Sequence, residues 1–369
     1  MKITSVQAIV LRLPDVTTAA DGTQDTCLIR IETDAGITGW GEVDSAPTVV
    51  RAAVEAPLSN GITRGLASAL EGSDPLAIDA CMQRIYDLTQ YYTRYGAGAH
   101  AVAGVNIALW DIAGKAYGQP IYRLFGAAQR QVRAYASVLF QDTPAETYEL
   151  AARLADRGFT AAKFGWGPMG QSEANDIALV REARRGLGEE VDLMVDAGQP
   201  WDWRTALVRT RQFAEFRPFW LEEPLHPEDV AGYGKLSAVS EIPIAGGESE
   251  SRLLDFEELI LVGGLDWVQA DPGRCGITTM VEIGRLAARH QRGFVNHTFK
   301  TGVSIAASLH VLAAVPNTQV LEYAMTESPI RHELTYEDFE LDAGWVGPSD
   351  APGLGVTINE ATLERYGVA

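Results

Sequence analysis

Seven charged or ionisable side chains recur at regular intervals through the second half of this 369-residue sequence. Successive members lie 23 to 33 residues apart, and each follows or ends a short run of β-forming residues. They are Lys163, Asp196, Glu222, Glu248, Asp271, His297 and Glu322. One charge after a strand is usually a loop residue or a helix cap, but seven in a shared register indicate a single site.

Three of these residues are carboxylates on consecutive strand-like runs: Asp196, Glu222 and Glu248. Carboxylate oxygens are hard ligands, and three of them with room for water and substrate suit Mg²⁺ better than zinc. The competing explanation is that each acid caps the helix that follows it.

Asp271 and His297 follow the next two runs. A carboxylate beside a histidine fixes the tautomer of the ring and raises its basicity, so this pair is predicted to be a general acid and base. Glu322 would bond a substrate oxygen if protonated, or pair with a cation. Lys163 would face the metal group and bind a substrate carboxylate, stabilise an enolate, or pair with an acid. A metal beside a base is an arrangement that removes the proton α to a carboxylate.

These side chains require parallel strands that end at a common edge. From about residue 130 short β-rich runs alternate with helical ones, beginning with Val132–Val138 and a helix whose start is marked by Thr143-Pro144-Ala145-Glu146, a capping box. Eight such units over about 200 residues predict an α/β fold with a (β/α)₈ barrel over residues 126–334.

Residues 1–125 have a different pattern and predict an N-terminal α+β domain that caps the barrel. The runs Ile3–Leu13, Thr26–Thr33 and Ile37–Val43 alternate as strands, residues 15–26 are predicted as a mobile loop, and a helix is predicted over Ala99–Tyr117. The C-terminal segment, about 335–369, is expected to pack back on this domain.

The composition restricts the partners. Asp and Glu number 49 against 30 Lys and Arg, giving a formal net charge of −19, which argues against nucleic acid and an anionic membrane surface. No apolar run is long enough to span a membrane, and the N-terminus lacks the pattern of a signal peptide. The three cysteines are widely spaced, which favours a reducing, cytoplasmic location.

Longer motifs carry a family resemblance over nearly the whole chain. They are ALWDIAGKAYGQPIYRLFG (108–126), MVDAGQPW (194–201), WLEEP (220–224), IAGGES (244–249), QADPGRCGIT (269–278), VNHTFKTGVSIAASLH (295–310) and LEYA (321–324). The chain resembles the enolase superfamily, in its mandelate racemase-like subgroup.

The resemblance implies one Mg²⁺ per site on Asp196, Glu222 and Glu248, with Glu223 behind them. It implies that Asp271 and His297 form the acid–base pair and that Glu322 lies near the substrate carboxylate or an enediolate oxygen. It also implies a homo-oligomer, from dimer to octamer.

The sequence departs from this subgroup on the second barrel strand. The usual Lys-x-Lys is Lys163-Phe164-Gly165 here, so the second lysine, a base opposite the histidine, is replaced by Gly165. Inversion of an α-carbon needs bases on two faces, and this disfavours racemisation. Dehydration needs one face if the elimination is syn, because His297 can remove the α-proton and then protonate the leaving 3-hydroxyl.

The substrate is expected to be a polyhydroxylated acid. An aromatic and basic segment supplies Arg94 and Tyr95, and Lys300, Trp166 and His226 are further substrate-binding candidates, although His226 fits a loop residue better. The sequence thus predicts a Mg²⁺-dependent acid-sugar dehydratase that acts on L-lyxonate or a related pentonate, hexonate or aldarate. The alternatives are a racemase or epimerase of a 2-substituted acid, and a catalytically silent binding barrel.

Overall fold

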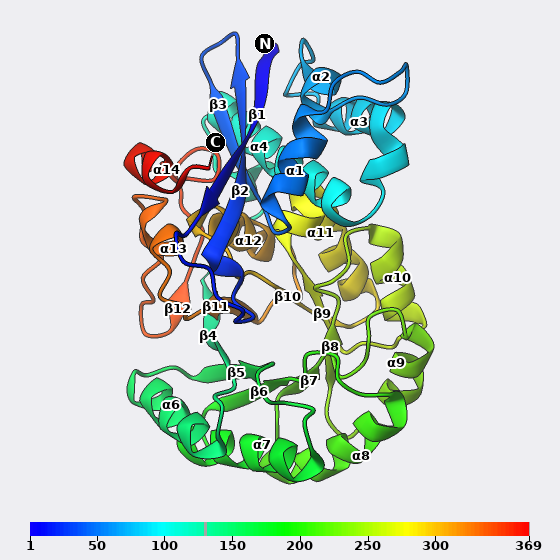
Figure 1. Ribbon diagram of the computed structural model, residues 1–369, viewed down its shortest axis with the longest axis vertical. Helices are drawn as coiled ribbons and strands as arrows, with labels where there is room; N and C mark the ends of the chain where they lie inside the picture. The colour runs from blue at the N-terminus through cyan, green and yellow to red at the C-terminus, as the bar shows by residue number, and fades with distance from the viewer. Residues whose placement is uncertain (129–130, 369) are drawn as a thin grey trace.

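Eight parallel strands form a nearly closed barrel in the computed structural model, which describes residues 1–128 and 131–368 (Figure 1). The barrel strands are β4 (Val132–Leu139), β5 (Ala161–Gly165), β6 (Asp192–Asp196), β7 (Trp220–Glu222), β8 (Ile244–Gly246), β9 (Trp267–Ala270), β10 (Gly293–Asn296) and β11 (Val320–Ala324). Neighbours pair in the order β10-β9-β8-β7-β6-β5-β4-β11. Between β10 and β11 the contact is looser: Phe294 and Thr318 form an isolated bridge, and the Glu322 N–H donates to Asn296 Oδ1 at 2.9 Å. The predicted α/β barrel is confirmed.

Helices follow the strands and cover the outside of the barrel. They are α6 (Pro144–Asp156), α7 (Glu173–Leu187), α8 (Trp203–Phe213) with the short η2 (Ala214–Phe216), α9 (Val230–Ser237), α10 (Leu253–Leu261), α11 (Pro272–Arg289) and α12 (Gly302–Ala314). The predicted capping box starts α6, because Thr143 Oγ1 accepts from the Glu146 N–H and Glu146 Oε2 accepts from the Thr143 N–H. Ser172 and Asp202 cap α7 and α8 in a similar way. Such caps satisfy the first helical N–H groups locally.

An antiparallel sheet and a group of helices form the N-terminal domain, drawn above the barrel in Figure 1. Its strands pair in the order β1 (Ile3–Arg12), β2 (Asp25–Thr33), β3 (Thr38–Val43). Its helices are α1 (Pro47–Glu55), α2 (Leu66–Leu70), α3 (Ile78–Thr93), α4 (Gly96–Tyr117) and α5 (Ile121–Leu124). The helix predicted over Ala99–Tyr117 is α4, and it ends where Gly118 takes φ of 62°. The segment 15–26 contains regular structure, because Gly22–Gln24 form a 3₁₀ turn, η1, capped by Asp21, and β2 begins at Asp25.

The last part of the chain joins the two domains. It contains α13 (Pro329–Glu333), β12 (Trp345–Val346), which pairs antiparallel with β4, and α14 (Glu360–Tyr366). Leu354 N–H donates to Asp111 Oδ1 of α4, and Val368 N–H donates to Val10 O of β1, each at 2.9 Å. The domain boundaries at 125 and 334 remain predictions, and residues 129–130 of the connection lie outside the described residues.

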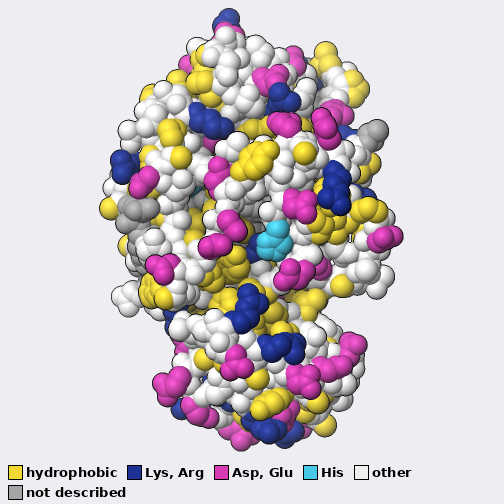
Figure 2. Space-filling model, turned by 90° about the vertical axis from the view of Figure 1, so that its left-hand side faces the viewer, with side chains coloured by type: hydrophobic (Ala, Val, Ile, Leu, Met, Phe, Trp, Pro, Cys, Tyr) yellow, Lys and Arg dark blue, Asp and Glu magenta, His cyan; other side chains and the backbone are white. Residues whose placement is uncertain are grey.

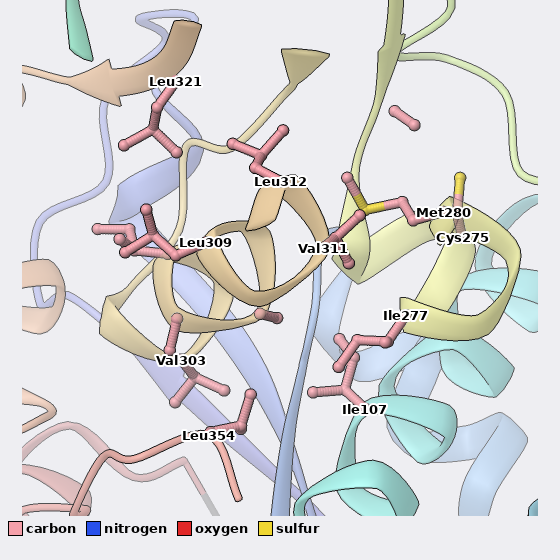
Figure 3. Close-up of a cluster of buried hydrophobic side chains, with 14 of the residues drawn as sticks. Ile107, Cys275, Ile277, Met280, Val303, Leu309, Val311, Leu312, Leu321 and Leu354 are labelled. Atoms are coloured by element: carbon pink, nitrogen blue, oxygen red, sulfur yellow. The ribbon is translucent and has the colours of Figure 1, made fainter. Parts of the chain in front are cut away.

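Apolar side chains fill the lower part of the barrel and the layer between its helices and the N-terminal domain. Inside the barrel, Trp220 and Trp267 pack with ring centroids 5.4 Å apart among other buried residues. A second cluster lies where α11 and α12 meet α4 (Figure 3), and Ile107, Ile277 and Val311 are among its members. Because apolar side chains fill the rest of the interior, the charged side chains predicted for the site lie toward the barrel mouth.

Acidic side chains are spread over the molecular surface. Figure 2 shows Asp and Glu scattered among Lys and Arg on one face rather than gathered in one patch. Among the described residues, no helix is long and apolar enough to cross a membrane.

Candidate active site

The seven predicted side chains meet at the carboxyl end of the barrel strands. Asp196 and Glu222 are the last residues of β6 and β7, and Asp271 and His297 directly follow β9 and β10. All seven are buried, with exposures of 8% or less. A cavity of about 150 Å³ opens at this mouth, and four of the seven line it: Lys163, Asp196, Glu248 and His297. A larger groove of about 690 Å³, between α3 and α4 on one side and α10 and α11 on the other, contains none of the seven. The chemistry therefore belongs to the smaller cavity.

Lys163 lies one pleat deeper than the acids it was predicted to face. In the pairing of β5 with β6, Lys163 stands opposite Met194, and Gly165 stands opposite Asp196. Its Nζ is 2.6 Å from Glu222 Oε1 and 2.7 Å from Glu322 Oε1. Burial alone would lower the pKa of Lys163, but these two carboxylates raise it well above its ordinary value. The structure thus shows the ion-pair alternative, and a role for Lys163 in binding the substrate or stabilising an enolate stays a prediction.

Gly165 leaves no space for the missing second lysine. A Cβ atom on Gly165 would lie 2.7 Å from Asp196 Oδ2 and 2.9 Å from Asp196 Cβ. Atoms this close must move apart, so a side chain at 165 would displace the Asp196 carboxylate. At this position the cavity is therefore lined by the Asp196 carboxylate and not by a second lysine.

The three strand-end acids fit a hard divalent cation. Burial and the Glu222 charge raise the pKa of Asp196 well above its ordinary value. Burial raises the pKa of Glu222 to about 7; Lys163 opposes this shift and Glu248 adds to it. Buried carboxylates that repel one another are costly without a cation, and Lys163 offers a single positive charge. A divalent cation held by Asp196, Glu222 and Glu248 would remove that cost.

A second group of metal-ligand types lies nearby, because single atoms of Asp44, Asp271 and His297 lie within 4.8 Å of one another. These atoms already have partners: Asp44 Oδ2 is 2.7 Å from Arg274, and Asp271 Oδ2 is 2.7 Å from His297 Nδ1. A cation here would have to displace Arg274. The three strand-end acids stay the predicted metal ligands, and among the described residues the tighter group of ligand atoms is that of Asp44, Asp271 and His297.

Asp271 and His297 form the predicted pair. Asp271 Oδ2 is 2.7 Å from His297 Nδ1, and Asp271 Oδ1 accepts from the Gly273 N–H at 2.6 Å. A carboxylate only accepts, so Nδ1 carries the hydrogen and Nε2 is left toward the site. Nε2 lies 3.6 Å from Glu248 Oε2. Burial alone would lower the pKa of His297, but Glu248, Glu322 and Asp271 raise it to about 10. A cation on Glu248 would weaken that effect and return the ring toward its neutral, basic form.

Glu322 accepts hydrogen bonds with both of its carboxylate oxygens. Its Oε1 accepts from Ser137 Oγ at 2.9 Å, and its Oε2 accepts from the Thr298 N–H at 2.8 Å. Burial alone would raise the pKa of Glu322, but Lys163 and His297 lower it below its ordinary value. The predicted alternative of pairing with a cation is what the structure shows. Glu223 lies behind the site and accepts from Gln199 Nε2.

Of the five predicted substrate-binding residues, Trp166 is the one that lines the cavity. It has φ of 54°, and its ring packs over the backbone of Gly198. Lys300 is buried beside the mouth, but its Nζ donates to Gly22 O at 2.6 Å and to Asp25 O at 3.0 Å. Lys300 thus holds the N-terminal loop rather than facing the cavity.

The other three candidates lie outside the cavity. Tyr95 is 58% exposed and stacks with Arg252, 4.0 Å from its ring centroid, and Arg94 lies beside the larger groove. His226 is exposed in the loop after β7, where its Nδ1 accepts from the Glu228 N–H. A role for Arg94 and Tyr95 in binding substrate therefore stays a prediction, and the position of His226 fits the loop residue that the sequence favours.

Sequence reasoning missed two charged residues that line the cavity, Asp44 and Arg274. Asp44 follows β3 in the N-terminal domain, and Arg274 lies in the first turn of α11, three residues after Asp271. Arg274 lies within the motif 269–278, and Asp44 directly follows the predicted strand Ile37–Val43. No local sequence pattern links Asp44 to Arg274, because they meet only where the two domains pack together.

Comparisons with known proteins find matches to both parts of the chain. Residues 146–362 match the family described as enolase C-terminal domain-like, and residues 3–126 match the mandelate racemase / muconate lactonizing enzyme N-terminal domain. A D-galactarolactone cycloisomerase from Agrobacterium fabrum is 33% identical over 92% of this chain and 90% of its own. A D-galactonate dehydratase from Verminephrobacter eiseniae is 33% identical over 91% of this chain and 90% of its own.

A solved structure is similar over the whole chain. It is described as a predicted mandelate racemase from Rhodobacter sphaeroides, with a TM-score of 0.93 and 33% identity, covering 100% of this chain and 95% of that one. The chain therefore belongs to the enolase superfamily, and the resemblance in its motifs is confirmed.

Proposed function

We propose that this protein is a Mg²⁺-dependent dehydratase of a sugar acid, an aldonate or aldarate, that forms a 2-keto-3-deoxy acid. The observation that supports this most directly is that one acid–base pair, Asp271 and His297, stands beside three buried acids. Gly165 stands where the subgroup that the chain resembles has a second base. A relative with 33% identity is named as a D-galactonate dehydratase, which supports the substrate class.

The residues divide the reaction as follows. Mg²⁺ held by Asp196, Glu222 and Glu248 would bind the substrate carboxylate and stabilise the negative charge that develops on it. His297 Nε2 takes the α-proton while Asp271 holds Nδ1–H and stabilises the imidazolium. The imidazolium then gives its proton to the departing 3-hydroxyl on the same face. One C–H and one C–O bond break, water leaves, and the resulting enol rearranges to the keto acid.

Racemisation or epimerisation is the first alternative, and isotope exchange separates the two reactions. In D₂O, an epimerase would return substrate that carries deuterium at the α-carbon with scrambled stereochemistry. A dehydratase accumulates keto acid. Lys163 is ion-paired with Glu222 and Glu322, and His297 is the histidine that lines the cavity, so we expect the second result.

A cycloisomerase is a second candidate, because a relative with 33% identity is named as a D-galactarolactone cycloisomerase. The two reactions share α-proton removal but differ in the leaving group. A hydroxyl leaves as water and needs an acid, whereas a lactone carboxylate leaves without one, and a single histidine can serve either reaction. Supplying each sugar acid in both its open and lactone forms distinguishes them.

The deciding experiment is a screen of sugar acids with Mg²⁺, read by keto-acid formation, with matched samples in EDTA. Turnover of an open-chain acid that is lost in EDTA supports the proposal. If only lactones are turned over, the result supports the cycloisomerase and contradicts the dehydratase. A protein that turns over neither form would be a silent binding barrel.

A further inference from the structure

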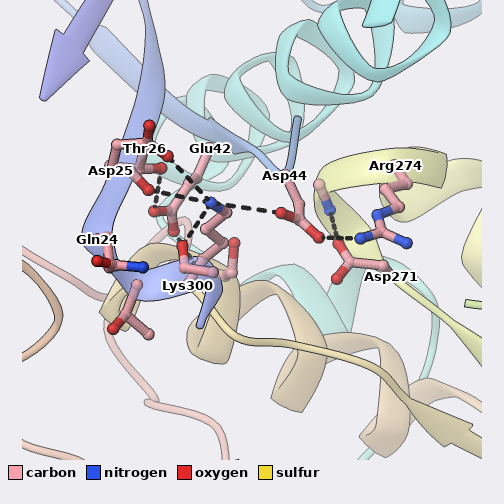
Figure 4. Close-up of polar contacts among 12 residues, drawn as sticks. Gln24, Asp25, Thr26, Glu42, Asp44, Asp271, Arg274 and Lys300 are labelled. Atoms are coloured by element: carbon pink, nitrogen blue, oxygen red, sulfur yellow. Dashed lines mark hydrogen bonds and ion pairs between the residues drawn. The ribbon is translucent and has the colours of Figure 1, made fainter. Parts of the chain in front are cut away.

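Residues at and just after the end of β3 contact the barrel at its mouth. Glu42 and Asp44 alternate along the chain and both extend from the N-terminal domain toward the barrel (Figure 4). Glu42 is fully buried, and Asp44 is 7% exposed. They reach the first turns of α12 and α11, the two helices that follow the strands carrying His297 and Asp271.

Glu42 caps α12. Its Oε2 accepts from Thr301 Oγ1 at 2.8 Å and from the Ser304 N–H at 3.1 Å, and its Oε1 accepts from Thr26 Oγ1 at 2.7 Å. A carboxylate at a helix N-terminus satisfies free N–H groups and is favoured by the helix dipole. The start of α12 is thereby fixed to the N-terminal sheet.

Asp44 joins the two cations that stand beside the acid–base pair. Its Oδ2 is 2.7 Å from Arg274 Nη2, and its Oδ1 is 3.4 Å from Lys300 Nζ. Its backbone N–H donates to Gly273 O at 3.3 Å. Burial alone would raise the pKa of Asp44, but Arg274 and Lys300 lower it below its ordinary value. Asp44 is therefore a permanent negative charge between two barrel segments.

The three residues that Asp44 contacts, Gly273, Arg274 and Lys300, each bond to or lie close to a predicted site residue or the cavity wall. Gly273, which accepts from Asp44, donates its own N–H to Asp271 Oδ1 at 2.6 Å. Arg274 Nη1 donates to the backbone carbonyl of Glu248 at 2.7 Å. Lys300 is three residues after His297 and holds Gly22, which forms part of the cavity wall.

We propose that Asp44 is a positioning residue for the acid–base pair, through which the N-terminal domain sets the geometry of Asp271 and His297. This inference rests on the proposed function for its kinetic readout. It assigns the N-terminal domain a part in orienting the proton-transfer groups in addition to closing the cavity. A shift of about 1 Å in such groups can lower the rate about 100-fold, so a residue that touches neither proton nor base can control the rate.

The test compares Asp44→Asn with a matched control, Thr278→Val. Thr278 also joins the two domains, since its Oγ1 accepts from Asn106 and Trp110 of α4, but it lies outside the barrel-mouth cavity. Two readouts are measured: kcat and KM on the acid identified by the screen, and the low-field proton resonance of the His297–Asp271 hydrogen bond, assigned by its absence in His297→Asn.

Asp44→Asn is expected to lower kcat roughly 10- to 100-fold, with KM within about threefold of wild type, and to shift or broaden the low-field resonance. Thr278→Val is expected to leave both unchanged. If kcat and the resonance of Asp44→Asn match wild type, the proposal is wrong. If KM alone rises, Asp44 contacts substrate directly, and the proposal is also wrong.

Arg274→Lys is the second variant in case Asp44→Asn does not fold, because it keeps the charge but cannot reach both Asp44 and the Glu248 carbonyl. The same change in the resonance is expected, and an unchanged resonance contradicts the proposal. If the wild-type enzyme turns over no sugar acid, the proposed function fails, and the resonance still decides the positioning role.

Discussion

At the scale of single residues, identical chemical groups have different roles because of their neighbours. Glu222 is the last residue of β7 and Glu322 lies in the middle of β11; both are buried acids, and both contact Lys163. Burial and the Glu248 charge raise the pKa of Glu222 to about 7, whereas the pKa of Glu322, which burial alone would raise, is lowered by Lys163 and His297. Their sequence patterns were alike, so the difference in protonation is a product of the surroundings.

The proton chemistry is predicted to depend on His297 alone. Replacing it with Asn keeps a polar group near Asp271 but removes the base, so keto-acid formation should fall by roughly 10²- to 10⁴-fold. Exchange of the substrate α-proton in D₂O, followed by proton NMR, should be lost with it.

A matched histidine control is His332→Asn, which alters an exposed ring on α13 and should behave as wild type. Exchange that persists in His297→Asn would assign the base to another residue, with Lys163 the first to examine.

At the scale of elements, the polar ends of helices are fixed by distant parts of the chain. His310 of α12 illustrates this, because its Nδ1 accepts from the Tyr122 N–H at 3.3 Å and its Nε2–H donates to Leu354 O at 3.1 Å. Both bonds require the neutral ring. Burial lowers the pKa of His310 to about 4. The motif that contains His310 resembled the family as a whole and gave no sign that this histidine is structural.

This histidine should make the fold sensitive to acid in a defined range. The unfolded chain binds a proton on His310 below about pH 6.5 and the folded chain only near pH 4, so stability should fall as the pH drops through that window. The loss is at most roughly 3 kcal/mol.

The measurement is urea unfolding at pH 7 and pH 5 for wild type and His310→Gln, whose amide supplies one donor and one acceptor. The variant should lose less stability between the two pH values. An equal loss in both proteins would show that His310 is not the group that titrates.

At the scale of the whole molecule, the charge of −19 separates into two parts. On the face that Figure 2 shows, acids are scattered over the surface, where such charges contribute to solubility. The few at the barrel mouth are buried and repel one another, so they favour a bound cation. The overall sign of the protein is thus no obstacle to an anionic substrate, because the local charge is set by the cation and by Lys163.

Mg²⁺ should therefore stabilise the fold. At 100 times its dissociation constant, a ligand that binds only the folded state adds about 2.7 kcal/mol, which is visible as a rise in the melting temperature over EDTA. Asp196→Asn should abolish that rise. Asp271→Asn should preserve it, because Asp271 belongs to the neighbouring cluster that Arg274 already neutralises. The reverse pattern would move the metal to that cluster.

The barrel, its eight strands and the charged residues near their carboxyl ends could be predicted from local patterns in the sequence. This was possible because periodicity and caps are local: Thr143 and Glu146 are three residues apart, and each strand-end residue is one βα unit from the next. The acid–base pair followed from the same register.

The pairing of these groups depends on how distant segments pack in the folded chain. Lys163 is one pleat below Asp196 because of strand register, and Asp44 meets Arg274 across 230 residues because two domains dock. Arg94, Tyr95 and His226 are not among the residues that line the cavity, and the direction of a loop depends on what it packs against. Distances between segments far apart in sequence are set by packing, and no local pattern records them.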